Sequence, residues 1–199
     1  MVIDGSVLSN GFGRGAGGSV FLEAAGLAGG GRVEAQGGAR AGGGRIALVA
    51  DSISEELVVR TSARGGLTTP SDAGGAAGTV YLRDAASIFG TLIVDNAGSA
   101  TNTTTELVPI GTGVVESVDA AGFTAVAAEF RHSVVGGWLA LDGDFDGPRR
   151  ILGHAHRGRT LALDPDDGGQ IPIPGATYEG FWRFDQLIVR GQGHLLVRD

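Results

Sequence analysis

The sequence predicts an all-β protein, most specifically a parallel β-helix, and three observations lead to this fold class. Glycine supplies 37 of the 199 residues and proline only 6, a share of glycine more than twice the usual one. Short apolar segments, punctuated by glycine, recur every 10 to 13 residues. Helical periodicity is nearly absent. Sandwich, barrel and solenoid are the three all-β options for this pattern.

One motif occurs three times in the first half of the chain, at residues 17–23, 43–49 and 77–83. Each copy places small residues before a segment in which aliphatic side chains alternate with other residues. Side chains alternate between the two faces of a strand, so the aliphatic positions of the three copies would share one inward face. These positions are Val20 and Leu22, Ile46 and Leu48, and Val80 and Leu82.

A second apolar segment follows each copy after 12 or 13 residues, at Val33, Val58 and Ile93. Each repeat would therefore hold two strands. The repeats are 26 and 34 residues long, and the longer one contains an insertion at residues 68–71. Because like segments recur in phase, we expect them to stack, since one coil cannot bury its inner face alone.

A looser rhythm continues in the second half, at residues 138–142, 160–164 and 186–190, and residues 91–95 fit the same pattern. At roughly 25 residues per coil the chain would form about eight coils. The prediction is one β-helix domain over residues 1–199, with Gly-rich coils at 1–98 and looser coils at 99–199. A β-sandwich is the alternative.

Composition restricts the possible functions. The net charge is −7 and all 15 basic residues are arginine, which disfavours nucleic acid as a partner. Cysteine is absent, which excludes disulfides and thiol nucleophiles. Residues 1–9 lack the pattern of a signal peptide, and the apolar runs are too short to insert into a membrane.

The run Gly-Gly-Ser-Val-Phe-Leu-Glu at residues 17–23, with its copies and Gly-Thr-Leu-Ile-Val-Asp at 90–95, resembles the glycine-rich β-helix repeats of large bacterial surface and secreted proteins. These proteins are adhesin-like or autotransporter-passenger-like. The resemblance implies a non-catalytic structural or adhesin-like module, extracellular or at the cell surface. We expect a piece of a longer chain, with carbohydrate or a host or cell-surface protein as partner, and end-to-end self-association between exposed coils.

One acidic motif has the spacing of a calcium loop. Asp142, Asp144 and Asp146 alternate and are followed by Gly147, as at the start of an EF-hand, whose oxygen ligands suit Ca²⁺. The position of the bidentate glutamate is Gly153 instead. The alternative is an acidic turn, supported by a second one at residues 164–169. The cofactor is therefore either none or calcium.

A carbohydrate-active enzyme, a polysaccharide lyase or hydrolase, is the alternative function. Carboxylates and arginines supply its parts, but no motif assigns a catalytic residue. His154 and His156 would share a strand face, without a third metal ligand. The aromatic residues at positions 178, 181, 182 and 184 are expected to pack a coil or an end, and Phe21 with Tyr81 would face outward.

Overall fold

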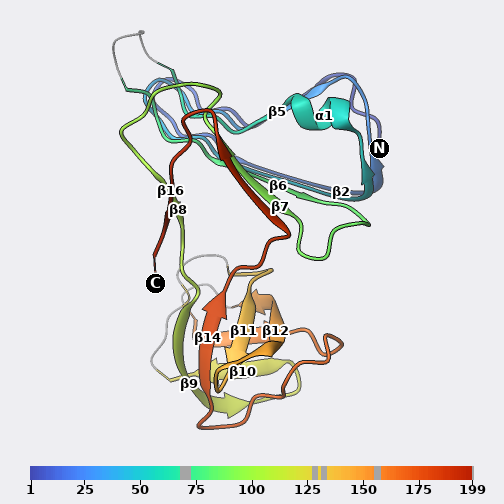
Figure 1. The fold of residues 1–199 in the computed structure, drawn as a ribbon, viewed down its shortest axis with the longest axis vertical. Helices are drawn as coiled ribbons and strands as arrows, with labels where there is room; N and C mark the ends of the chain where they lie inside the picture. The colour runs from blue at the N-terminus through green and yellow to red at the C-terminus, as the bar shows by residue number, and fades with distance from the viewer. Residues whose placement is uncertain (68–72, 127–129, 131–133, 155–157, 199) are drawn as a thin grey trace. The chain divides into compact units, whose positions relative to one another are not determined.

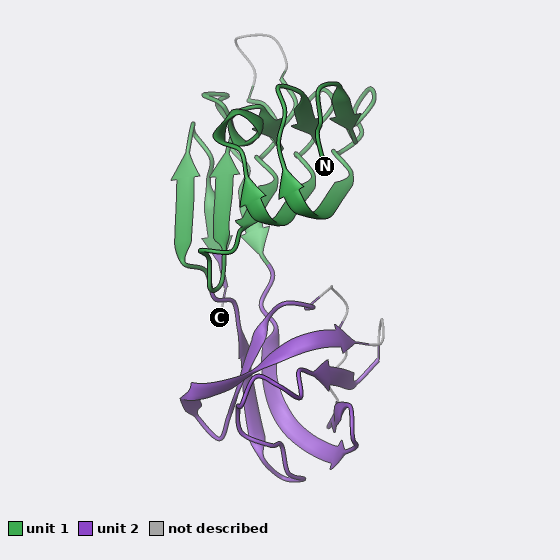
Figure 2. Cartoon of the chain, turned by 90° about the vertical axis from the view of Figure 1, so that its right-hand side faces the viewer, with its two compact units in different colours: residues 1–107, 184–196 green, residues 108–183, 197–199 purple. Residues whose placement is uncertain are grey.

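The computed structural model describes residues 1–67, 73–126, 130, 134–154 and 158–198. The chain is all-β and divides into two compact units, shown in green and purple in Figure 2. Unit 1 comprises residues 1–107 and 184–196, and unit 2 comprises residues 108–183 and 197–199. The insertion at residues 68–71 lies outside the described residues.

Unit 1 contains short strands in three sheets (Figure 1). A five-stranded sheet has the order β15-β7-β6-β4-β2, a three-stranded sheet the order β1-β3-β5, and β16 pairs with β8. The elements are β1 (Ser6–Leu8), β2 (Ser19–Leu27), β3 (Arg32–Glu34), β4 (Arg45–Ile53), α1 (Glu55–Val59), β5 (Thr61–Ser62), β6 (Thr79–Arg83), β7 (Thr91–Asp95), β8 (Thr105–Leu107), β15 (Gln186–Arg190) and β16 (Leu195–Val197).

The three motif copies form β2, β4 and β6, which pair in parallel and in register. Val20 pairs with Ile46 and Ile46 with Val80, and the next inward positions match in the same way. The predicted matching of the copies is therefore confirmed. Ile46 is 2% exposed and Leu48 0%, so the middle strand carries the buried centre of the unit 1 core.

Glycine is required just before β2, β4 and β6, where the backbone lies close to the segments that follow β1, β3 and β5. The second residue of each copy is a glycine, and it donates its backbone N–H to the carbonyl oxygen of the residue that follows β1, β3 or β5. At Gly43 a Cβ atom would overlap the carbonyl oxygen of Ala63, so the site accepts no larger residue without a backbone shift. The three hydrogen bonds are Gly18 to Ser9 (2.7 Å), Gly44 to Ala35 (2.7 Å) and Gly78 to Ala63 (2.6 Å).

The parallel β-helix of about eight coils is wrong, because much of the pairing is antiparallel. In unit 1, β7 runs antiparallel to β6. Val58 lies in helix α1 rather than in a strand. The Ser54 hydroxyl accepts from the Leu57 N–H at 3.4 Å, and Glu55 and Glu56 fill the first turn. This is the signature of a helix N-terminus, which overrode the expected strand.

Unit 2 is a closed barrel of six antiparallel strands, in the order β10-β13-β12-β11-β14-β9. Leu139 and Leu161, which the looser rhythm predicted to stack in neighbouring coils, lie on β11 and β13, with β12 between them. Similar spacing along the chain therefore did not mean neighbouring strands. The strands are β9 (Gly111–Val118), β10 (Gly122–Ala125), β11 (Trp138–Leu141), β12 (Asp144–His154), β13 (Thr160–Leu163) and β14 (Thr177–Phe181).

The barrel is inserted into the sequence of unit 1. The chain leaves unit 1 after Leu107 and returns at Phe184, where β15 pairs in parallel with β7. The Arg190 Nε atom lies 2.7 Å from the Asp95 carboxylate, and the Asp185 carboxylate accepts from the N–H groups of residues 88, 89 and 90 at 2.9 Å each. The divisions at 107/108 and 183/184 differ from the change of character expected near residue 98.

Candidate functional site: an aromatic face on the barrel

The outer wall of the barrel carries aromatic side chains on two adjacent strands. Leu139 on β11 and Tyr178 on β14 belong to the barrel core, so strand alternation turns Trp138 and Phe181 outward. These two residues are direct cross-strand partners. Ala140, also on the outer side of β11, is 0% exposed. The outer wall is therefore closed to solvent at this point.

Phe145 on β12 adds a third ring. Its centroid lies 5.4 Å from that of Phe181, with the planes tilted by 52°. Phe145 is 46% exposed, whereas Trp138 and Phe181 are partly buried. We call Trp138, Phe145 and Phe181 the aromatic face. Figure 1 shows the three strands that carry it, β11, β12 and β14, grouped in unit 2.

A local turn positions Phe145. Asp142 and Gly143 join β11 to β12, and both have positive φ, 49° and 79°, as the two-residue type I′ hairpin turn requires. The Asp144 carboxylate then accepts from the N–H groups of Asp146 (3.0 Å) and Gly147 (3.1 Å). These bonds fix the backbone around Phe145, whose ring lies next to that of Phe181.

Charged side chains lie around the rings. The Arg183 guanidinium carbon is 5.8 Å from the centroid of the Trp138 ring, a cation–π distance. Arg150 is the cross-strand partner of Trp138 on its other side. Glu179 is exposed and lies two residues before Phe181 on the same strand, so both face outward. The site therefore combines apolar ring surface with hydrogen-bond donors and acceptors.

The other aromatic residues near the end of β14 have different roles. Tyr178 packs inside the barrel, 5.2 Å from Phe123, and its burial raises the pKa of the phenol above 10.0. Trp182 donates to the Val108 carbonyl oxygen at 2.8 Å and packs on the core. Phe184 belongs to unit 1 and meets Tyr81 edge to face. The predicted aromatic cluster is therefore divided among two cores and one surface.

The three aspartates of the predicted calcium site take part in the hairpin. The Asp142 carboxylate accepts from the N–H of Thr177 (2.8 Å) and from its hydroxyl (3.1 Å), and Asp144 caps the turn that holds Asp146. Among the described residues, no group of three or more acidic or histidine side chains is arranged to hold a metal ion. The calcium site stays a prediction, and the contacts favour the acidic turn.

The second acidic turn is tied down by a buried ion pair. The Asp167 carboxylate lies 3.0 Å from the Arg149 Nε atom, and the two side chains are 8% and 9% exposed. Arg149 also donates to the carbonyl oxygens of Asp164 and Gly169, and Asp167 accepts from the Arg150 N–H. The two charges therefore neutralise each other and stabilise the loop.

Among the described residues, Asp144 of the first acidic turn and His154 lie far apart. Asp144 and His154 stand at opposite ends of β12, separated by about 30 Å of extended chain at about 3.3 Å per residue. His154 lies against the Phe130 ring. Its predicted partner His156 lies outside the described residues. The aspartates of the first turn and His154 therefore do not share a site.

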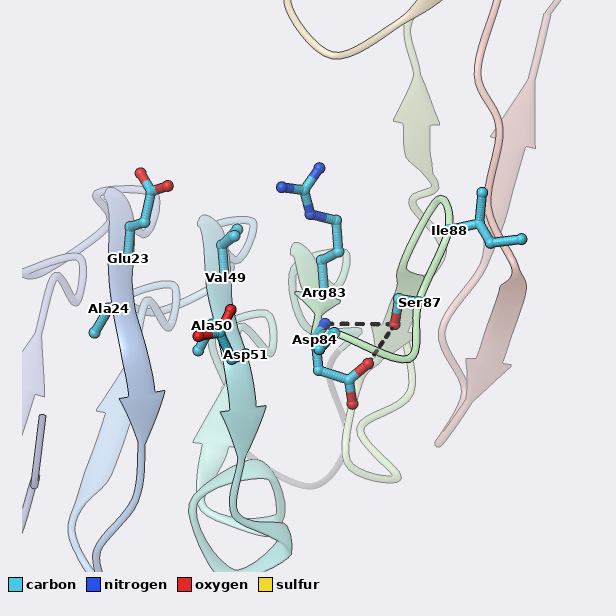
Figure 3. Close-up of a pocket in the computed structure, with 10 residues that line it drawn as sticks. Glu23, Ala24, Val49, Ala50, Asp51, Arg83, Asp84, Ser87 and Ile88 are labelled. Carbon is cyan, nitrogen blue, oxygen red and sulfur yellow. Dashed lines mark hydrogen bonds between the residues drawn. The ribbon is translucent and has the colours of Figure 1, made fainter. Parts of the chain in front are cut away.

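Unit 1 has a separate polar cavity of about 310 Å³ beside the middle of β2 and β4 and the end of β6. Figure 3 shows Glu23, Val49 and Arg83 on neighbouring strands, with Asp84 and Ser87 on the loop that follows β6. A hydrogen bond from the Ser87 hydroxyl lowers the pKa of Asp84 below 3.8. A carboxylate that ionises this readily is poorly suited to act as a general acid.

The two outward aromatics of the motif copies have different environments. The Tyr81 hydroxyl donates to the Phe89 carbonyl oxygen at 2.8 Å, so the loop after β6 lies against it. Phe21 is 64% exposed. Phe21 was therefore correctly predicted to face outward, whereas nothing in the sequence pattern marked Trp138 and Phe145 as outward aromatics. The Asp142-Gly143 turn is the signal that could have placed these two on adjacent strands.

The described residues contain no helix long and apolar enough to cross a membrane. Comparison of the chain with protein-family models, with curated proteins and with solved structures finds no match.

Proposed function

We propose that the chain is a non-catalytic structural and adhesive module of a bacterial surface or secreted protein. Unit 1 would serve as the scaffold, and the barrel inserted into it would bind carbohydrate or a cell-surface protein. The aromatic face is the observation that carries this proposal. Exposed apolar surface rimmed by polar groups typically marks an interaction site, and aromatic residues with arginine are enriched where proteins bind partners.

The construction of unit 1 supports a scaffold role. Three in-register parallel strands and the repeated glycine hydrogen bonds tie the motif copies to one another and to the segments that follow β1, β3 and β5. The amide of Asn96, 0% exposed, accepts from the Gly65 N–H (2.8 Å) and donates to the Ser99 carbonyl oxygen (2.7 Å). Such a dense network opens rarely, which suits a support for a binding unit.

The position of the charged groups favours binding over catalysis. The carboxylates of the two acidic turns accept hydrogen bonds from nearby backbone or pair with Arg149. Catalytic carboxylates of glycosidases must instead face a common substrate. The arrangement of these carboxylates, which stabilise turns, therefore fits a non-catalytic role.

The location is part of the same proposal. The glycine-rich repeat at residues 17–23, 43–49 and 77–83 resembles repeats of bacterial surface and secreted proteins, and this resemblance supports an extracellular or cell-surface site. Strands β2 and β15 are the outer strands of their sheet, and open edges can pair with another chain. Self-association between copies is thus part of the proposal, and sizing by light scattering over a concentration series tests it.

The adhesive role is tested with fluorescent beads that carry the full chain. Beads are scored for attachment to bacterial and eukaryotic cells, and the Phe181→Ala variant is compared with Phe12→Ala. Phe12 is 98% exposed and belongs to unit 1, so it controls for the loss of an exposed ring. We expect attachment that Phe181→Ala abolishes and Phe12→Ala leaves intact. Wild-type beads that attach to no cell would overturn the proposal.

A further inference from the structure

We propose that the aromatic face binds a neutral pyranose glycan, with Arg183, Arg150 and Glu179 contacting its hydroxyl groups. This inference rests on the proposed function, because it names the ligand of the adhesive face.

The rings suit one side of a sugar. A pyranose ring has a face of C–H bonds, whose weakly positive hydrogens are attracted to the negative face of an aromatic ring. Phe145 and Phe181 lie 5.4 Å apart and are tilted by 52°, so they present ring surface in two orientations. Trp138 is the cross-strand partner of Phe181, and with Arg183 over its ring it borders this surface on the β11 side. A glycan of two or more residues could contact several rings at once.

The rim suits the hydroxyl groups of the same ligand. Each hydroxyl both donates and accepts hydrogen bonds. The exposed Glu179 carboxylate supplies an acceptor beside Phe181, and the Arg183 guanidinium supplies donors beside Trp138. Arg150 adds donors across β11. Acceptors and donors on different sides of the rings allow a sugar to be fixed in orientation as well as held by stacking.

The charge of unit 2 favours a neutral glycan over an anionic one. Residues 108–183 contain ten Asp and Glu residues against six arginines. Glu179 and the acidic hairpin turn at residues 142–146 both lie near the rings. Like charges repel across an interface, so uronates, sulfated glycans and nucleic acids are disfavoured at this surface.

The experiment titrates the full chain with soluble cellohexaose, laminarihexaose and mannohexaose and follows binding by calorimetry. Polygalacturonate and poly-L-proline serve as anionic and peptide probes. We expect at least one neutral oligosaccharide to bind. Phe181→Ala should weaken this binding at least tenfold, and Glu179→Gln several-fold, because the exposed carboxylate of Glu179 has no packing role whose loss would unfold the barrel. Phe12→Ala should leave the affinity unchanged.

Several results would overturn the inference. No binding of any neutral oligosaccharide at 10-fold higher protein concentration, tighter binding of polygalacturonate, or binding of poly-L-proline alone would each exclude a neutral glycan. Binding that neither Phe181→Ala nor Glu179→Gln weakens would exclude this surface. If beads still attach to cells in a Phe181-dependent manner while no oligosaccharide binds or competes, the ligand class fails and the adhesive role stands.

Discussion

In unit 1, the ionised carboxylate of Asp84 stabilises a turn, and this stabilisation depends on pH. Its carboxylate accepts from the Ser87 hydroxyl at 2.8 Å and from the Ala86 N–H at 3.1 Å. The Ser87 hydrogen bond is the main reason that the pKa of Asp84 falls below 3.8. A pKa lower in the folded than in the unfolded state stabilises the fold above the unfolded value. This contribution is lost as the pH falls through the folded pKa, below 3.8.

Ser87→Ala should raise the pKa of Asp84 toward its ordinary value, because it removes the strongest hydrogen bond to the charged form. The carboxyl carbon of Asp84, followed by NMR during a pH titration, reports this change. Ser87→Thr keeps the hydroxyl and serves as the control, with the low pKa retained. An unchanged titration in Ser87→Ala would assign the shift to the backbone bonds instead.

Two ion pairs in the barrel should differ sharply in their importance. Arg149 and Asp167 are buried, whereas Arg159 and Glu116 are 45% and 47% exposed at 2.6 Å. Asp167→Ala leaves a buried charge without its partner, which costs about 3–5 kcal/mol of unfolding free energy. Glu116→Ala should cost less than about 1 kcal/mol. Urea unfolding followed by tryptophan fluorescence measures both, and equal losses would contradict the contrast.

Calcium and the hairpin turn make opposite predictions for residues 142–146. A bound ion stabilises the folded state by mass action, so a site there would raise the melting temperature by several degrees over that in a chelator. The carboxylates of Asp142 and Asp144 already accept two hydrogen bonds each. We expect equal melting temperatures with calcium and with chelator. A clear rise that Asp146→Asn removes would establish the calcium site.

At the scale of elements, glycine sets how closely the sheets of unit 1 approach. Gly43→Ala would place a methyl group against the Ala63 carbonyl oxygen, and the strands must separate to admit it. We expect a loss of about 3 kcal/mol, since overpacking of this kind forces a backbone shift. Gly5 has open space around a would-be Cβ, so Gly5→Ala is the matched control. Hydrogen exchange in β4 and β6 is measured for both variants, and we expect faster exchange in Gly43→Ala than in Gly5→Ala. Equal protection in the two variants would show that a Cβ atom at residue 43 does not separate the strands.

The sequence supported the prediction of elements better than that of their pairing. Repetition fixed the register of β2, β4 and β6, because copies of one motif present the same side chains at the same positions. It failed for Leu139 and Leu161, whose separation of 22 residues resembled one coil and concealed an intervening strand, β12. Antiparallel closure depends on contacts between distant segments, and no local pattern encodes these. The Asp142-Gly143 pair was the one local signal of antiparallel pairing, because Asp-Gly is typical of a two-residue hairpin turn. The same residues were interpreted instead as the start of a calcium loop.

The candidate site was only partly predictable for the same reason. Trp138 and Phe145 lie seven residues apart and become neighbours of Phe181 only when β14 joins β11. Phe21 was recognisable because it sits inside a repeated motif. The aromatic face has no such repeat, so its members are separate residues until the barrel closes.

At the scale of the whole molecule, the chain builds unit 1 from segments on both sides of the barrel. The run Leu-Ile-Val occurs at residues 92–94 and again at 187–189, and the two runs pair in register. Unit 1 is therefore complete only after the barrel has been made. The two tryptophans, Trp138 and Trp182, both belong to unit 2, so their fluorescence reports on the barrel alone.

A chain that ends at Arg183 should weaken unit 1 and spare the barrel. It lacks β15, which covers one edge of β7, where Ile93 and Val94 are 8% and 0% exposed. Exposure of this edge should speed hydrogen exchange in β6 and β7 by roughly tenfold or more, while the tryptophan emission stays native. A chain that ends at Gly193 keeps β15 and its ion pair with Asp95, and should exchange as the full chain does. Loss of the tryptophan signal in the shorter chain, with exchange in β7 unchanged, would reverse the assignment of residues 184–193 to unit 1.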